Sequence, residues 1–129
     1  MELQFSNVDL VIKSSEDLSP LSAELNDKTN ITYCGPTDEG NLINLEVSGM
    51  HTDPNETAHE ICRVIEQLSD AGKQRWNAAS QRTFDAGYEV AVSHGPIEIA
   101  IRWDTLQRIV ALGANFAVTL YPSESAVHH

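Results

Sequence analysis

Histidines, acids and cysteines are the side chains of this sequence whose types could support chemistry. His51, Asp53, Glu56 and His59 carry the nitrogen and oxygen donors that bind zinc. His51, however, precedes a predicted helix cap, whereas His59 lies about one and a half turns inside that helix. The donors would converge only through a loop that folds back, so solvated polar residues at a helix entry are the better interpretation. We predict no metal and no cofactor.

The two cysteines, Cys34 and Cys62, lie far apart in the sequence and have no CxxC setting. Neither a disulfide framework nor a zinc site is implied. A reactive thiolate requires an accessible, electropositive environment. Cys62 lies among apolar residues at helical spacing and is interpreted as a core residue, whereas Cys34, just before Gly35-Pro36, stays open to either interpretation.

Adjacent acids are the third group, in pairs such as Glu16-Asp17 and Asp38-Glu39. Adjacency in sequence does not place two carboxylates across a substrate, and such pairs are usually solvated loop charges. The sequence has no glycine-rich phosphate loop, nucleophile elbow, HExxH or EF-hand pattern. We therefore predict no catalytic residues and no enzymatic activity.

The net charge is the most unusual property of the chain. Eight Lys and Arg side chains stand against 19 Asp and Glu side chains, which gives −11 at pH 7. Residues 1–60 carry 12 acids and two bases, whereas residues 61–129 carry seven acids and six bases. A field of this sign repels nucleic acid and anionic membranes and attracts basic partners. Solubility is the alternative reason for such acidity.

The elements that must position these residues follow from the spacing of apolar side chains, which predicts the order β-α-β-β-α-β-β-α-β. Strands are expected at 3–13, 30–35, 41–48, 84–93, 96–102 and 115–121. Helices are expected from Ser19 to about Asp27, from Pro54 to a stop at Gly72, and after Asp104 to a stop at Gly113. We predict one α+β domain over residues 1–127, with a mostly antiparallel sheet and helices packed on one face.

Several local patterns refine these elements. A slip in the alternation of the first strand predicts a bulge near Asn7. Ser19 is expected to cap the first helix, with Pro20 in its first turn. Asp53 and Asp104 each begin a capping-box pattern and are expected to cap the other two helices.

Apolar residues in the second helix recur at three- and four-residue intervals, which predicts one face on the core: Ala58, Ile61, Cys62, Val64, Ile65 and Leu68. Trp76 follows in a connector at 73–82 and is either a lid over the core or an exposed contact. His94-Gly95 is the expected turn between the strands at 84–93 and 96–102. Trp103 continues the inward series of Ile97, Ile99 and Ile101, so it is interpreted as core.

The segment 103–121, WDTLQRIVALGANFAVTLY, resembles the helix-Leu-Gly-strand ending of a bacterial α+β family whose function is unknown. Leu10-Val11-Ile12 and Leu18-Ser19-Pro20 are similar to that family's first strand and helix. The resemblance covers about a third of the chain. It implies an immunity protein of a bacterial toxin system, because such small domains recur there, and it carries no catalytic residues.

Our first hypothesis is an immunity protein that binds and neutralises a cognate basic toxin domain, such as a nuclease. Its partner-binding residues are expected in loops and on the polar face of the hairpin: Glu16, Asp17, Tyr33, Asp38, Glu39, Glu46, Asp53 and Trp76. One alternative is a small-ligand or metal-dependent enzyme, which only the segment from His51 to His59 favours. The other is an acidic structural or regulatory subunit. The oligomeric state is left open.

The chain lacks a long apolar run and a basic, apolar start, so we expect a cytoplasmic protein. His128 and His129 are interpreted as the remnant of an affinity tag, and no function is assigned to them.

Overall fold

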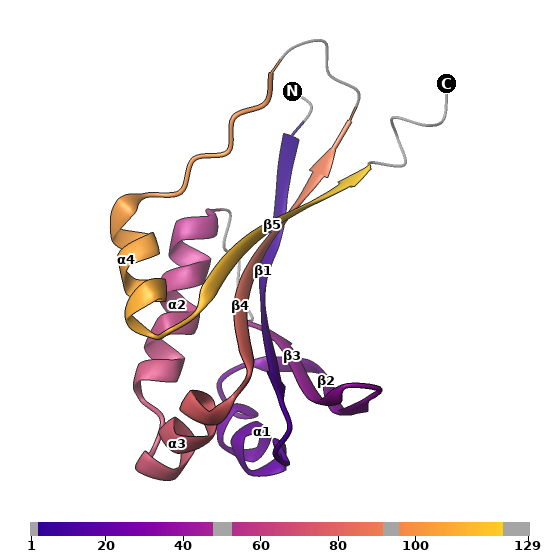
Figure 1. Cartoon of the computed structure of the whole chain (residues 1–129). Helices are drawn as coiled ribbons and strands as arrows, with labels where there is room; N and C mark the ends of the chain where they lie inside the picture. Colours follow the sequence, from indigo (N-terminus) through magenta and orange to yellow (C-terminus); the bar gives the residue numbers. More distant parts are fainter. Residues whose placement is uncertain (1–2, 48–52, 92–95, 123–129) are drawn as a thin grey trace.

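The computed structural model describes residues 3–47, 53–91 and 96–122. The elements in these ranges follow one another in the order β1-α1-β2-β3-α2-α3-β4-α4-β5 (Figure 1). Their bounds are β1 Leu3–Ser14, α1 Ser19–Leu25, β2 Asn30–Thr37, β3 Gly40–Glu46, α2 Pro54–Glu66, α3 Asp70–Ala78, β4 Gln81–Val90, α4 Trp103–Ala111 and β5 Asn115–Pro122. None of these described helices has the length and apolar composition that a membrane crossing requires.

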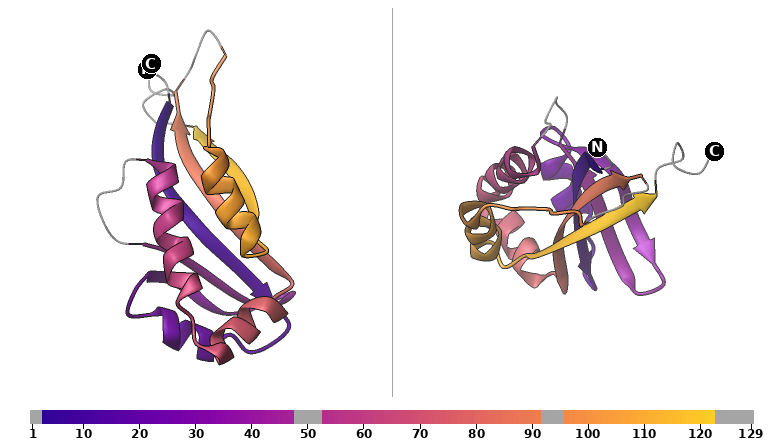
Figure 2. Two further views of the ribbon diagram at one scale, coloured as in Figure 1. Left: turned by 90° about the vertical axis from the view of Figure 1, so that its left-hand side faces the viewer. Right: turned by 90° about the horizontal axis from the view of Figure 1, so that it is seen from above.

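The strands form one five-stranded sheet in the order β2-β3-β1-β4-β5. Neighbouring strands are antiparallel except β4 and β5, which are parallel. The helices lie on one face of this sheet, and the described elements leave the other face open (Figure 2). The prediction of an α+β fold, with a mostly antiparallel sheet and helices on one face, is confirmed.

β1 is the central strand, and the alternation of its sequence decides which side chains enter the core. Val8, Leu10 and Ile12 are fully buried, whereas the residues between them are not. The register against β4 shifts between Phe5 and Asn7, so the predicted bulge is confirmed. The shift places Phe5 on the same face as Val8, where it packs against the core.

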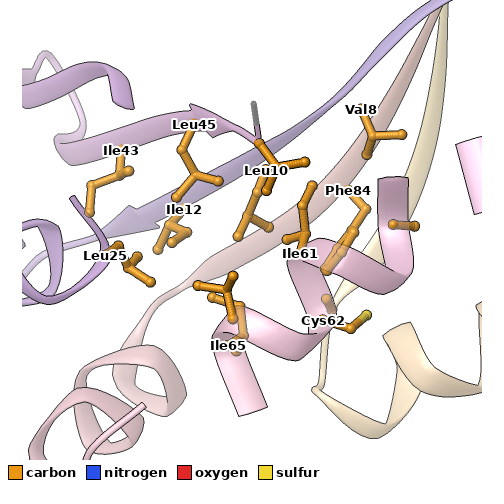
Figure 3. Packing of buried hydrophobic residues seen from close by; sticks show 14 of the residues in the cluster. Val8, Leu10, Ile12, Leu25, Ile43, Leu45, Ile61, Cys62, Ile65 and Phe84 are labelled. Carbon is orange, nitrogen blue, oxygen red and sulfur yellow. The ribbon is translucent and has the colours of Figure 1, made fainter. Parts of the chain in front are cut away.

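α2 supplies the helical side of the core. Its apolar stripe is buried as predicted, and Leu68 beyond its end is buried too. Figure 3 shows Ile61 and Ile65 pointing from α2 toward the β1 side chain of Leu10. Asp53 accepts a hydrogen bond from the backbone N–H of Asn55 at 2.9 Å, so the predicted N-cap of this helix is confirmed.

The helix predicted to run as far as Gly72 is wrong, because the chain forms two helices there. α2 ends at Glu66, and α3 begins at Asp70. The Ser69 hydroxyl caps α3 by accepting a hydrogen bond from the backbone N–H of Gly72 at 3.0 Å. Gly72 therefore lies in the first turn of a new helix. A Cβ there would lie 2.5 Å from the Glu24 carboxylate of α1, so the glycine leaves room for that side chain, which accepts hydrogen bonds from Ser69.

The strand predicted at 96–102 is also wrong. These residues have no regular secondary structure and connect the sheet to the start of α4 (Figure 1). β4 pairs instead with β5, because α4 returns the chain to the end of the sheet where β4 began. Ile99 packs against the core, but Ile97 is exposed. The alternation therefore belongs to an extended segment along the edge of the core, residues 96–102, which we call the strap. The expected His94-Gly95 turn lies outside the described residues.

Trp103 is not the core residue that the sequence predicts, because it begins α4 with 75% of its surface exposed. The predicted Asp104 cap is wrong as well. Asp104 lies in the first turn, and the N-cap residue is Arg102, which makes no side-chain cap bond. At the other end of α4, Gly113 has a φ of 71°, so the predicted glycine stop is confirmed.

Two smaller corrections concern the first half of the chain. Ser19 does not cap α1, because the Asp17 carboxylate accepts the Ser19 backbone N–H at 2.9 Å instead. The β2–β3 turn is shorter than predicted, since β2 continues through Pro36 to Thr37. Gly40 closes that turn with a φ of 124°, and a Cβ there would lie 2.8 Å from the Ser14 carbonyl oxygen.

Replacing Ile65 by aspartate should destabilise the protein strongly. Ile65 is 2% exposed between α2 and the sheet, so an unpaired carboxylate there would be desolvated. We expect a loss of several kcal/mol in the free energy of unfolding, about 3 or more, measured by chemical denaturation. Gln67→Asp, which places the same carboxylate at an exposed position just after α2, is the control. An unchanged unfolding midpoint for Ile65→Asp would contradict this core.

Candidate functional site on the open face of the sheet

The open face of the sheet carries the side chains that alternate with the core residues. On β1 these are Asn7, Asp9, Val11 and Lys13, all of which are partly exposed. The pleat of the strand determines this arrangement, because successive side chains point to opposite faces of the sheet. Burying the apolar half of β1 therefore presents its polar half to solvent.

Three carboxylates from three strands meet on this face. Asp9 of β1 lies opposite Asp85 of β4 in the antiparallel register, and Glu46 of β3 lies on the other side of β1. The three acids share a small hollow of about 150 Å³, whose lining also includes Ser6, Asn7, Gly87 and Tyr121. We call Asp9, Glu46 and Asp85 the carboxylate cluster.

Neutral groups hold the outer members of the carboxylate cluster in place. The Asn7 amide donates to Glu46 at 2.6 Å, and the Asn30 amide donates to the same carboxylate at 3.3 Å. The Thr119 hydroxyl lies 2.8 and 2.9 Å from the two Asp85 carboxylate oxygens. These donors fix the orientation of the carboxylates without neutralising their charge.

The carboxylate cluster is electrostatically unfavourable for the folded chain. Burial raises the pKa of Asp9 above its ordinary value, and the neighbouring Glu46 and Asp85 carboxylates raise it further. Like charges placed directly opposite each other in a sheet destabilise it. The cluster therefore costs stability rather than supplying it.

The arginines of the described residues lie away from the open face, so they do not compensate the charge of the carboxylate cluster. Ion pairs join Arg63 to Glu60, Arg75 to Glu16, Arg102 to Asp53 and Asp104, and Arg108 to Glu66. Among the described residues, no member of the carboxylate cluster forms an ion pair. Lys13 is the one base on the open face of the described strands.

Four of the acids predicted from loops lie at one end of the sheet, where Arg75 of α3 contacts Glu16 and Asp17. Asp38 and Glu39 form the β2–β3 turn and are exposed. Glu16 and Asp17 lie in the loop after β1, and the Asn41 amide joins this loop to the hairpin by donating to the Glu16 carbonyl at 2.9 Å. The structure therefore brings these two acidic pairs to the same end of the sheet.

The remaining predicted acids separate from each other. Glu46 belongs to the carboxylate cluster, whereas Asp53 caps α2 on the helical side and lies 3.8 Å from Arg102. Asp53 therefore has a structural role and does not share the acidic face.

The two predicted aromatic contacts also separate. Tyr33 is 43% exposed on β2, and its hydroxyl donates to the Pro36 carbonyl at 2.6 Å. Trp76 is buried, and its indole N–H donates to the Leu112 carbonyl at 2.8 Å. Trp76 is therefore a lid over the core, fastened by Arg82, which donates to the Trp76 carbonyl at 2.7 Å. Only Tyr33 can contact a partner without unfolding.

His59 takes part in a chain of hydrogen bonds that joins α2 to α4. Arg108 can only donate, so its bond of 2.9 Å to Nδ1 leaves the proton of a neutral His59 on Nε2. Nε2–H then donates to the Thr105 hydroxyl at 3.1 Å, and Thr105 donates to the Asn55 carbonyl oxygen at 2.7 Å. Asn55 also accepts the Arg102 backbone N–H at 3.0 Å. Every polar group of this helix contact is matched.

The chemistry considered for histidine and cysteine finds little support in this geometry. Within the described ranges, no three His, Cys, Asp or Glu side chains are placed to hold one metal ion, and His51 lies outside those ranges. Cys62 is buried, as predicted, and burial raises the pKa of its thiol to about 11. Cys34 is exposed and free.

Sequence reasoning missed Asp9 and Asp85. Both alternate with buried residues inside predicted strands, so the pattern assigns them to the polar face. That these two polar positions meet depends on β1 pairing with β4, which the sequence does not specify. Attention to the polar half of each strand, rather than to loops alone, would have found them.

The chain matches no protein-family model, curated protein or solved structure among those compared with it. Its function must therefore be inferred from the arrangement of its own residues.

Replacing Asp9 by asparagine should stabilise the protein at neutral pH. The raised pKa means that the folded state holds the Asp9 proton more tightly than the unfolded state does, so the carboxylate opposes folding above that pKa. We expect a gain of a few tenths to about 1 kcal/mol at pH 7 from removing the like-charge contact. The gain should shrink as the pH falls through the raised pKa and vanish below the unfolded value. Urea unfolding against pH tests this, with Glu98→Gln as the control, and a loss of stability at pH 7 would contradict it.

Replacing Thr105 by valine should loosen α4. Valine keeps the shape but leaves the His59 Nε2–H without its acceptor and removes one of the donors to Asn55. We expect a loss of about 1–3 kcal/mol in the free energy of unfolding. Thr105→Ser, which keeps the hydroxyl that His59 and Asn55 contact, is the matched control. Equal stability of the two variants would show that the hydrogen-bond chain contributes nothing.

Proposed function

We propose that this protein is an immunity-type binding protein that neutralises a cognate basic toxin domain through the open face of its sheet. The observation that carries the proposal is the carboxylate cluster, in which three acids share one face and form no ion pair among the described residues. A basic partner would supply the missing compensation, and it would relieve the repulsion that the free protein tolerates.

The acids at the hairpin end extend this surface. From the Asp38-Glu39 turn, β3 runs through six further residue steps from Gly40 to Glu46, which corresponds to about 20 Å at the rise of a strand. We call this stretch, with the carboxylate cluster at one end and the turn at the other, the acidic track. Its length suits a partner with an extended basic cleft, such as a nuclease cleft that holds a phosphate backbone.

Tyr33 provides an apolar contact beside the acidic track. Its position opposite Asn44 in the sheet places it next to the strand that carries the track. Its ring is held by the hydrogen bond to Pro36, so little conformational freedom would be lost on binding. Tyrosine anchors of this kind commonly contribute much of the binding free energy, while the surrounding charges set the rate of encounter.

The resemblance inferred from the sequence of the segment 103–121 implies an immunity protein, although no family model matches the chain. It bears on α4 and β5 rather than on the acidic track. The proposal therefore depends on the track and uses the resemblance only to choose a toxin as the partner.

The association rate with the toxin domain encoded beside this chain tests the proposal. We expect the rate to fall at least about tenfold between 0.1 M and 1 M salt, because the Debye length shrinks from ~10 Å to ~3 Å. Asp38→Lys should slow association, whereas Glu98→Lys, which changes the net charge equally away from the track, should do so far less. Reversing Asp38 and Glu39 together should also weaken protection of cells that carry the toxin. A flat salt profile, or equal effects of the two single reversals, would refute the proposal.

A further inference from the structure

We infer that the surface formed by α4 and β5 is a self-association surface, on which a second copy of this chain docks by pairing β5 with β5. This inference is independent of the toxin hypothesis. It concerns the sheet edge opposite β2, and it starts from where the exposed apolar side chains lie.

Exposed apolar side chains concentrate in the last part of the described chain. The large ones on α4 and on the helix-side face of β5 are Trp103, Leu106, Val110, Val118 and Leu120, whereas Tyr121 points to the open face, where it lines the hollow of the carboxylate cluster. In the rest of the described chain only Ile97, in the strap before α4, and Tyr33 at the far edge of the sheet are comparably exposed. Contiguous apolar exposure of this kind marks an interaction surface rather than scattered surface residues.

The charge of this region indicates what covers it. Residues 96–122 hold two acids, Glu98 and Asp104, and two bases, Arg102 and Arg108, so they are neutral, whereas the whole chain carries −11. A basic partner would be drawn to the acidic track instead. Two copies of this negatively charged chain repel each other, and the electrostatic repulsion is smallest where the neutral edges meet.

β5 is suited to pairing with itself. It is the outer strand next to β4, and no described strand hydrogen-bonds to its other side. Its sequence NFAVTLYP has no charged residue that would oppose its own copy across a two-fold axis. An exposed strand edge without charges is a ready template for another strand. Antiparallel pairing about a two-fold axis would give the free backbone N–H and C=O groups of both β5 strands the same set of hydrogen bonds.

The helices reinforce this pairing. α4 lies beside β5 and covers its first part (Figure 2). Trp103, Leu106 and Val110 form a stripe along α4, with spacings of three and four residues, and Trp103 and Val110 are 75% and 70% exposed. When β5 pairs with its copy at ~4.8 Å, the helices above the two edges come within the ~8–10 Å at which helices pack. The apolar stripe is then covered by its own copy.

A groove between the end of α4, the end of α2 and α3 lies next to Val110, and Glu66 and Lys73 also line it. It has a volume of about 450 Å³ and is lined in part by Ile65, Trp76, Val110 and Leu112. Antiparallel packing of two α4 helices centred near Leu106 sets the Trp103 of each copy opposite the Val110 of the other. The indole then lies at the mouth of the groove, where large apolar area can be buried.

Sedimentation equilibrium of the full chain tests this inference. We expect a mass twice the 14.2 kDa of one chain, with dissociation on dilution. Val110→Lys should weaken the dimer on the order of tenfold or more, even though it lowers the net negative charge. Ala23→Lys makes the same charge change at an exposed position on α1 and should leave the dimer intact. Because Val110 is exposed and lysine favours helix, the variant should keep its melting temperature.

Salt and fluorescence separate this association from binding of a basic partner. Salt should tighten the dimer, since it screens repulsion between like-charged copies, whereas it should slow capture of a basic toxin. In a Trp76→Phe background, Trp103 emission should shift to the red on dilution as the indole regains solvent. A monomer at all concentrations, or a dimer unaffected by Val110→Lys, would overturn the inference. So would loss of toxin binding by Val110→Lys in a chain that is always monomeric.

Discussion

The pairing of β1 with both β3 and β4 is the constraint on which the rest of the structure depends. β1 is central, so its apolar half must face the helices, and the pleat then fixes its polar half on the opposite face. The same register places Asp9 opposite Asp85 and beside the strand that carries Glu46. One strand thus builds the core and the carboxylate cluster together, and a slip of one residue would exchange them.

The bulge at Asn7 shows how the chain reconciles these two demands. Without the shift, Phe5 and Val8 would point to opposite faces. The extra residue lets both enter the core, and it leaves the Asn7 amide on the open face, where it holds Glu46. A local irregularity thereby keeps the apolar set continuous and supplies a donor to the site.

Sequence periodicity was sufficient for most elements and for the fold class. It failed where tertiary contacts rather than local pattern decide the outcome. The isoleucines at 97, 99 and 101 alternate as in a strand, yet they form a strap, because β5 occupies the edge of β4 that a hairpin would need. Spacing alone places Trp103 on the inward side of that series, but α4 begins at Trp103, after the N-cap Arg102, and exposes the indole.

The candidate site was harder to predict than the fold for a physical reason. Loop acids such as Asp38 and Glu39 can be selected from sequence because turns are exposed. The meeting of Asp9 with Asp85 requires strand order and register, which single-sequence patterns do not contain. The prediction that Gly72 ends the second helix was wrong for a similar reason. Its contact with Glu24 joins α1 to α3, and the local sequence gives no sign of that contact.

The order of the strands also separates the two surfaces of the molecule. β2 and β3 carry the acidic hairpin to one edge, while the parallel crossover through α4 sends the uncharged β5 to the other. Edge pairing about a two-fold axis perpendicular to the sheet would keep all helices on one face. The open faces of both copies would then continue into each other on the opposite side, with the hairpins at the far ends. In such a dimer, a contact made by neutral residues doubles the extent of the acidic surface, and the two surfaces meet at Tyr121, which belongs to β5 and also lines the hollow of the carboxylate cluster.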